Sequence, residues 1–121
     1  MRGLMLCAVW LLTLLPTAAL AGKADVLKVQ VTRQGESYRF DVTVAHEDTG
    51  WDHYADAWEV VGPDGKTLGV RTLFHPHVDE QPFTRSLSGV KIPAGVDRVT
   101  VRAHDKLDGW GGAEVTVKIP Q

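Results

Sequence analysis

The five histidines of this 121-residue chain fall in three short segments, each of which also carries acidic side chains. His46 and His53 bracket the first segment, His75 and His77 lie in the second, and His104 opens the third. Neutral imidazole nitrogens and carboxylate oxygens bind transition metals, and the same groups can transfer protons. If the fold brings the three segments together, these side chains form either a metal site or an acid–base site.

The sequence His75-Pro76-His77 is the sharpest local pattern. Proline favours an extended conformation for the residue before it, and side chains two positions apart in an extended chain point the same way. Both imidazoles are therefore expected to face one point in space, with one or two of His46, His53 and His104 as further metal ligands. The alternative is an ordinary polar loop in which Pro76 only ends a strand.

Acidic residues in these segments are candidates for oxygen ligands, or for acceptors that orient an imidazole. Those singled out are Asp56, Asp79, Glu80 and Asp105, and Asp48, Asp52 and Asp108 lie in the same segments. Asp56 is expected to face inward, where a carboxylate needs a partner. That partner is a histidine of the site, or Arg71 or Arg85 in a structural ion pair.

Trp51 and Trp110 flank the polar segments. They could shield a metal centre, offer a surface on which a sugar or a protein partner stacks, or plug the end of the hydrophobic core. Trp58 is instead expected to be the large core residue of its strand, as in many β-sandwiches.

Residues 1–21 have the pattern of a signal peptide. Arg2 is followed by an apolar run over residues 4–15, and Ala19-Leu20-Ala21 matches the small-residue pattern of a cleavage site. The run is shorter than the roughly 20 residues of a membrane span, and no second run follows. We expect cleavage near Ala21 and a periplasmic or secreted protein without a membrane anchor.

The composition of residues 22–121 limits which side chains could bind a metal. Cys7, Met1 and Met5 all precede them, so they offer no thiolate or thioether, which excludes a disulfide scaffold and a soft copper(I) site. Imidazoles with carboxylates suit copper(II), zinc, nickel or iron.

The charge balance bears on nucleic-acid binding. Of the 13 basic residues only Arg2 is lost with the leader, which leaves 12 basic against 15 acidic residues and no run of basic residues. Nucleic acid is therefore not an expected partner.

Apolar and polar residues alternate with period two over seven segments, which predicts an all-β fold. The segments are 27–32, 38–44, 54–61, 67–74, 83–87, 99–103 and 115–119. About 100 residues in seven strands is the size of a single immunoglobulin-like antiparallel β-sandwich. In that fold the connections between strands two and three, four and five, and six and seven emerge at one end. These connections are the ones that carry the histidines.

The same alternation assigns the faces of the strands. The first strand is expected to place Leu27, Val29 and Val31 on one face, and the third to turn Asp56 and Trp58 to one face. In the second and sixth strands, one face is formed by Phe40, Val42 and Val44 and by Val99, Val101 and Ala103.

Three strings resemble those of a family of small exported bacterial proteins of unassigned function: GWDHYADAW at 50–58, HPHVDEQPFTR at 75–85 and GWGG at 109–112. The resemblance covers most of residues 22–121 and implies a periplasmic location and a shared polar end, but no activity. The stretch from His53 to Trp58 is more distantly similar to the histidine-tyrosine stretch of superoxide reductases. These hold iron on an immunoglobulin-like domain through four histidines and one cysteine. Residues 22–121 lack that cysteine, so the reductase chemistry does not carry over.

We therefore expect an exported protein that binds a divalent transition metal through its histidines, as a carrier, sensor or accessory protein. The alternative is a metal-independent module that binds a periplasmic protein or a glycan through the same loops. A third reading is an enzyme that pairs a histidine with Asp56 or Asp105 as acid and base. No serine elbow, phosphate loop or paired-glutamate motif supports it, so no catalytic residue is assigned.

Overall fold

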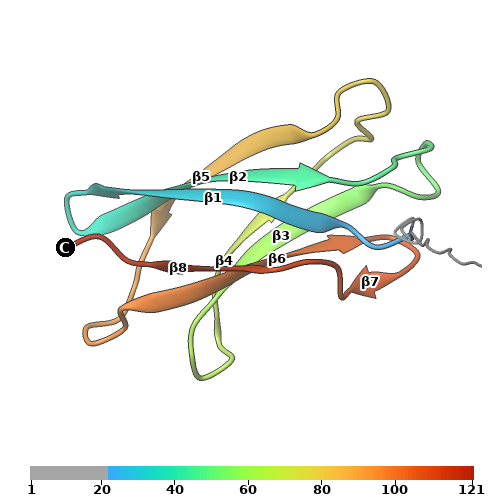
Figure 1. Ribbon diagram of the computed structural model, residues 1–121. Helices are drawn as coiled ribbons and strands as arrows, with labels where there is room; N and C mark the ends of the chain where they lie inside the picture. Colours follow the sequence, from blue (N-terminus) through green and yellow to red (C-terminus); the bar gives the residue numbers. More distant parts are fainter. Residues whose placement is uncertain (1–21) are drawn as a thin grey trace, which may run out of the picture.

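The computed structural model describes residues 22–121, which form two antiparallel β-sheets packed face to face (Figure 1). The first sheet has the order β1 (Asp25–Gln34), β2 (Ser37–Ala45) and β5 (Phe83–Val90). The second has the order β4 (Thr67–Thr72), β3 (Ala55–Val61), β6 (Arg98–Asp105) and β7 (Gly109–Trp110), and β8 (Val115–Lys118) also pairs with β6. The predicted all-β sandwich is confirmed. The predicted signal peptide lies outside the described residues.

The structure has one strand more than the seven expected. The extra strand, β7, is only two residues long and pairs with the end of β6, with Trp110 opposite His104 and Gly109 opposite Asp105. The sequence predicts a glycine-rich loop here. Gly109 has a φ of +73°, a conformation that glycine adopts readily, so the chain reverses at once and briefly rejoins the sheet.

The core lies between the sheets and follows the predicted alternation of β2 and β6. Trp58 of β3 is fully buried, which confirms its prediction as the large core residue. Around it pack Phe40, Val42, Val44, Val60, Val99, Val101 and Phe83.

Two irregularities in strand pairing contradict the predicted faces of β1 and β3. The register shifts between Val26 and Lys28, so Val26 is buried and Leu27 is exposed. It shifts again between Ala55 and Ala57, and the side chain of Asp56 is half-buried on the outer face of its sheet. The expectations that Leu27 shares a face with Val29 and Val31 and that Asp56 faces inward are wrong, because one extra residue in a strand reverses the alternation beyond it.

Three connections emerge at the same end of the sandwich, as predicted: residues 46–54, 73–82 and 106–108 (Figure 1). The segment that leads into β1 reaches this end too, where it packs against the chain after β7. Val26 N–H donates to the carbonyl of Ala113, Ala113 N–H donates to Asp25, and Lys23 donates to the carbonyl of Asp108. We call this end the histidine pole.

Glycine at position 112 is required by this packing. A Cβ atom built on Gly112 would lie 1.9 Å from the carbonyl oxygen of Ala24, a distance no side chain can occupy. The GWGG string therefore has a structural role, because its last glycine lets the segment before β1 pack directly against the backbone of residue 112.

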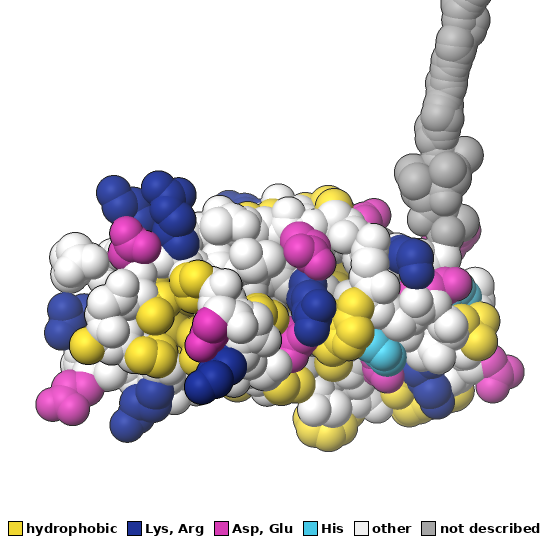
Figure 2. Space-filling view, turned by 90° about the horizontal axis from the view of Figure 1, so that it is seen from below, with side chains coloured by type: hydrophobic (Ala, Val, Ile, Leu, Met, Phe, Trp, Pro, Cys, Tyr) yellow, Lys and Arg dark blue, Asp and Glu magenta, His cyan; other side chains and the backbone are white. Residues whose placement is uncertain are grey.

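Basic and acidic side chains are interspersed over the face shown in Figure 2, in keeping with the small formal charge of −2. Within residues 22–121, no helix has the length and apolar character to cross a membrane.

Candidate metal centre

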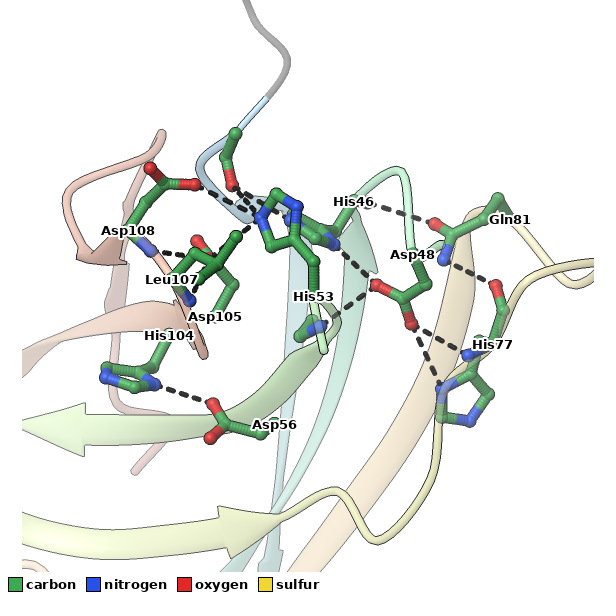
Figure 3. Close-up of polar contacts among 12 residues, drawn as sticks. His46, Asp48, His53, Asp56, His77, Gln81, His104, Asp105, Leu107 and Asp108 are labelled. Carbon is green, nitrogen blue, oxygen red and sulfur yellow. Dashed lines mark hydrogen bonds and ion pairs between the residues drawn. The ribbon is translucent and has the colours of Figure 1, made fainter. Parts of the chain in front are cut away.

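Two histidines meet at the histidine pole, His46 and His53, with their ring centroids 4.7 Å apart and the rings edge to face (Figure 3). His46 follows β2 and keeps the inward parity of Val44, so its ring is buried. His53 immediately precedes β3, and Asp105 ends β6. One potential ligand atom from each of His46, His53 and Asp105 lies within 4.8 Å of the other two. Two sheets and three chain segments thus contribute to one cluster.

Asp48 fixes the ring of His46. Its Oδ1 lies 2.5 Å from His46 Nδ1 and accepts the backbone N–H of Ala55 at 2.9 Å, while Oδ2 accepts the backbone N–H of His77 at 2.7 Å. The other nitrogen of the ring, Nε2, lies 2.9 Å from the carbonyl oxygen of Gly22. A single buried carboxylate therefore orients His46 and joins two of the three connections.

His53 presents one ring nitrogen, Nε2, to three oxygens. These oxygens are Asp105 Oδ1 at 3.1 Å, Asp108 Oδ2 at 3.1 Å and the carbonyl oxygen of Gly22 at 3.3 Å. Asp105 is fully buried, and its Oδ1 also accepts the backbone N–H groups of Leu107 and Asp108. Asp105 Oδ2 has no hydrogen-bond partner within the described part of the chain. The cluster is thus rich in oxygen acceptors around two imidazole nitrogens.

The two imidazoles carry too few N–H groups to form a hydrogen bond to every oxygen that lies near their nitrogens. A neutral imidazole carries one N–H, yet both nitrogens of His46 face oxygens and His53 Nε2 faces three. The oxygens around His53 also change its pKa. Burial alone lowers this pKa, but the Gly22 carbonyl, Asp105 and Asp108 favour the protonated ring. Their combined effect is larger, so the pKa of His53 is raised above its ordinary 6.5. Electrostatically, this is a position that favours a cation.

His75 and His77 are neighbours, as the sequence predicts, with ring centroids 4.7 Å apart. His77 is only 5% exposed and stacks on Phe83 at 4.0 Å, while the His75 side chain is exposed. Neither ring nitrogen of His77 has a hydrogen-bond partner among residues 22–121, and Nδ1 is 3.9 Å from Asp48 Oδ2. Burial, followed by the charge of Arg85, lowers the pKa of His77. The pair lies beside the cluster and does not enter it.

His104 lies apart from the other four histidines. Asp105 points inward, so alternation along β6 turns His104 to the outer face of the sheet. There its Nδ1 lies 2.6 Å from Asp56 Oδ1, and its ring is edge to face with that of Trp110, with the ring centroids 4.9 Å apart. The partner of Asp56 is thus a histidine, and Arg71 donates instead to the carbonyl of Ser86. The structure therefore brings His46 and His53 together in one cluster and places His75, His77 and His104 outside it.

The remaining predicted residues have separate roles in the structure. Asp79 is exposed, and Glu80 accepts hydrogen bonds from Arg85 at 3.0 and 3.3 Å, which lower the pKa of Glu80. Trp51 is 62% exposed, so it does not plug the core. Trp110 is partly buried beneath the guanidinium of Arg102, at 4.6 Å from its ring, and offers less free surface than Trp51.

Sequence reasoning placed Asp48 and Asp108 at this end without assigning them to the site, and it missed the carbonyl of Gly22. The sequence did indicate the role of Asp48, because it lies two positions after His46 and so points to the same side of an extended chain. The role of Gly22 could not be foreseen, because it depends on how the segment before β1 packs.

No family model matches the chain. A protein of Halomicrobium mukohataei named "Putative lipoprotein" is 44% identical over 92 residues, which cover 74% of this chain and 45% of that protein. The chain thus spans less than half the length of this relative.

Two solved structures share the fold. A hypothetical protein from Pyrococcus horikoshii OT3 has a TM-score of 0.52 at 14% identity and covers 83% of this chain and 94% of that one. A superoxide reductase in the oxidised state also has a TM-score of 0.52, at 13% identity, and covers 84% and 91%. At these identities the likeness shows the β-sandwich architecture alone.

Proposed function

We propose that this protein binds one divalent transition metal ion at the histidine pole, through His46 Nε2, His53 Nε2 and the carboxylate of Asp105. The observation that carries the proposal is the convergence of these groups, with the Asp108 carboxylate and the Gly22 carbonyl beside them and too few N–H groups to satisfy the oxygens. A cation at this point takes the place of the missing protons.

The surroundings of His46 match the way proteins orient a metal-binding imidazole. Asp48 accepts the Nδ1–H of His46 and so leaves the lone pair of Nε2 directed into the cluster. Two imidazoles and a carboxylate suit zinc, copper(II), nickel or iron, whereas calcium and magnesium prefer sites made of oxygens alone. His75, His77 and His104 are not ligands in this proposal.

The protein acts outside the cytoplasm in this proposal, as a metal carrier, a sensor or an accessory protein. Two observations support export: the signal-peptide pattern of residues 1–21, and the similarity to a protein named as a lipoprotein. In this proposal the site lies within residues 22–121.

Isothermal titration of residues 22–121 with zinc, copper(II) and nickel at neutral pH tests the proposal. We expect saturable one-to-one binding that His53→Ala weakens by about 10-fold or more, since even groups behind the ligands contribute 10- to 100-fold. His75→Ala is the matched control, because it removes an exposed histidine of the same pole and should leave the affinity unchanged. Absence of one-to-one binding for all three metals, or equal loss in both variants, overturns the proposal.

A second candidate function uses the exposed apolar residues of the same pole. Trp51 and Leu107 are 62% and 69% exposed, and their loops are adjacent because Lys106 N–H donates to the carbonyl of Tyr54, whose ring Trp51 contacts. Aromatic residues are enriched in protein–protein interfaces. We propose as the alternative a module that binds an exported protein or a glycan here. A pull-down that survives EDTA and is lost in Trp51→Ala supports it, and a pull-down that Trp51→Ala leaves intact rejects it.

A further inference from the structure

The backbone of Gly22 takes part in the proposed metal site. Its carbonyl oxygen lies 2.9 Å from His46 Nε2 and 3.3 Å from His53 Nε2, within hydrogen-bonding distance of both imidazoles. The contacts of Lys23 with Asp108 and of Asp25 with Ala113 hold the chain there. The carbonyl of Gly22 is therefore fixed by the fold.

The Cα atom of Gly22 is close to a second oxygen of the cluster. A Cβ atom built on Gly22 would lie 3.1 Å from Asp108 Oδ2, and the φ of +115° disfavours every residue except glycine. The nitrogen of Gly22 is bonded to this same Cα. It therefore lies within two bonds of the carbonyl carbon, close enough for the nitrogen and the carbonyl oxygen to bind one ion together.

Gly22 is also the first residue of the chain expected after signal-peptide cleavage. Hydrolysis of the peptide bond between residues 21 and 22 by a signal peptidase consumes one water molecule and leaves a carboxylate on residue 21 and an α-amine on Gly22. An amide nitrogen is a poor metal ligand because its lone pair is delocalised into the carbonyl. The amine has a free lone pair, and it can rotate about the Cα–C bond while the carbonyl stays in place.

We propose that cleavage before Gly22 creates a ligand of the metal site, the α-amine of Gly22, which binds together with the carbonyl oxygen of the same residue in a five-membered chelate. This inference rests on the proposed metal site and adds one nitrogen and one oxygen donor to it. Export then completes the site: the precursor has two imidazoles and carboxylates but no amine. Full affinity appears only after the leader is removed, which limits metal loading before export.

The first step of the test is the intact mass of the exported protein, which must correspond to a chain that starts at Gly22. The second compares that chain with one that retains residues 18–21, in which the nitrogen of Gly22 is an amide. Zinc and copper(II) affinities are measured by competition with a chromophoric chelator, and the number of coordinated nitrogens by copper(II) electron paramagnetic resonance. His53→Ala in the chain that starts at Gly22 is the control for the site itself.

We expect the retained residues to weaken binding by about 10-fold or more, as loss of a group that supports a metal does, and to remove one nitrogen from the copper(II) spectrum. A different cleavage position, or equal affinity and equal spectra in the two chains, overturns this inference while the metal site stands. Absence of binding in both chains overturns the metal site and this inference with it.

Discussion

At the scale of single residues, the histidine pole is organised by a carboxylate that is not itself a proposed ligand. Asp48 is completely buried and accepts hydrogen bonds from the backbone of Ala55 and His77 while contacting the ring of His46. A buried carboxylate is stable only when its oxygens are satisfied by donors. Asp48 therefore couples the stability of the pole to the orientation of the metal-binding ring.

Replacement of Asp48 by asparagine tests this coupling. One oxygen becomes an NH₂ group that cannot accept a backbone N–H, so we expect a loss of about 3 kcal/mol in the free energy of unfolding. Metal affinity should fall by about 10- to 100-fold, because a neutral amide is a weaker acceptor than a carboxylate and holds the ring of His46 less firmly. Urea unfolding and metal titration measure the two effects. Asp52→Asn, at an exposed position of the same loop, is the control and should change neither.

The lowered pKa of His77 predicts that the metal-free protein loses stability in acid. Its pKa is lowered by burial, so the unfolded chain binds a proton near the ordinary pKa of 6.5 while the folded protein does so only at lower pH. Between those values the unfolded state holds more protons, and stability is lost as the pH falls. We expect His77→Phe, which keeps the stacking on Phe83, to reduce the loss of thermal stability between pH 7.5 and 5.5 in EDTA. An unchanged difference between the two pH values would show that His77 does not titrate in this way.

At the scale of strands, period-two alternation predicted much of the fold and part of the site. It predicted the seven main strands, the core faces of β2 and β6, and the end at which the three connections meet. The same alternation puts His46 in line with Val44, and Asp105 in line with Ala103, on the inward side. It also turns His104 outward, so the separation of His104 from the cluster was readable from the sequence.

Other features were not readable, because they depend on local departures from regular pairing. The register shift near Val26 exposes Leu27, and the shift near Ala55 moves Asp56 to the outer face. Neither shift has a glycine or a proline that marks it in the sequence. His75 and His77 met each other as expected, but the stacking of His77 on Phe83 directs that ring away from the cluster.

The packing of the segment before β1 against Gly112 can be tested by substitution. In Gly112→Ala the added Cβ would meet the carbonyl of Ala24 at 1.9 Å, so the segment must move. We expect a loss of about 1–3 kcal/mol, typical of overpacking, and weaker metal binding because the carbonyl of Gly22 leaves the cluster. Gly62→Ala is the control, since the closest contact of its Cβ would be a movable oxygen of Asp64 at 3.2 Å and its other neighbours would lie at 3.5 Å or more. Equal metal affinity in Gly112→Ala and the wild type would contradict the role of this segment.

At the scale of the whole molecule, the proposed site joins parts of the chain that are distant in sequence. His46 follows a strand of the first sheet, whereas His53 and Asp105 flank strands of the second sheet. Residues 22–121 contain no cysteine and therefore no disulfide that could link the two sheets. A bound ion would supply a cross-link at the histidine pole.

The metal should therefore stabilise the domain. At a free metal concentration 100 times the dissociation constant, binding to the folded state alone adds about 2.7 kcal/mol to the free energy of unfolding. We expect a higher melting temperature with zinc than with EDTA, and no such increase in His53→Ala. An equal increase in the variant would indicate that the metal binds elsewhere, for example at His75 and His77.

The position of the ion is the most direct test of the proposed metal centre. Crystals of residues 22–121 soaked with zinc should show one anomalous-difference peak at the zinc absorption edge, at about 2.0–2.2 Å from His46 Nε2, His53 Nε2 and an Asp105 oxygen. A peak at His75 and His77 or at His104 and Asp56, or the absence of a peak at full soaking concentration, would contradict the proposed centre.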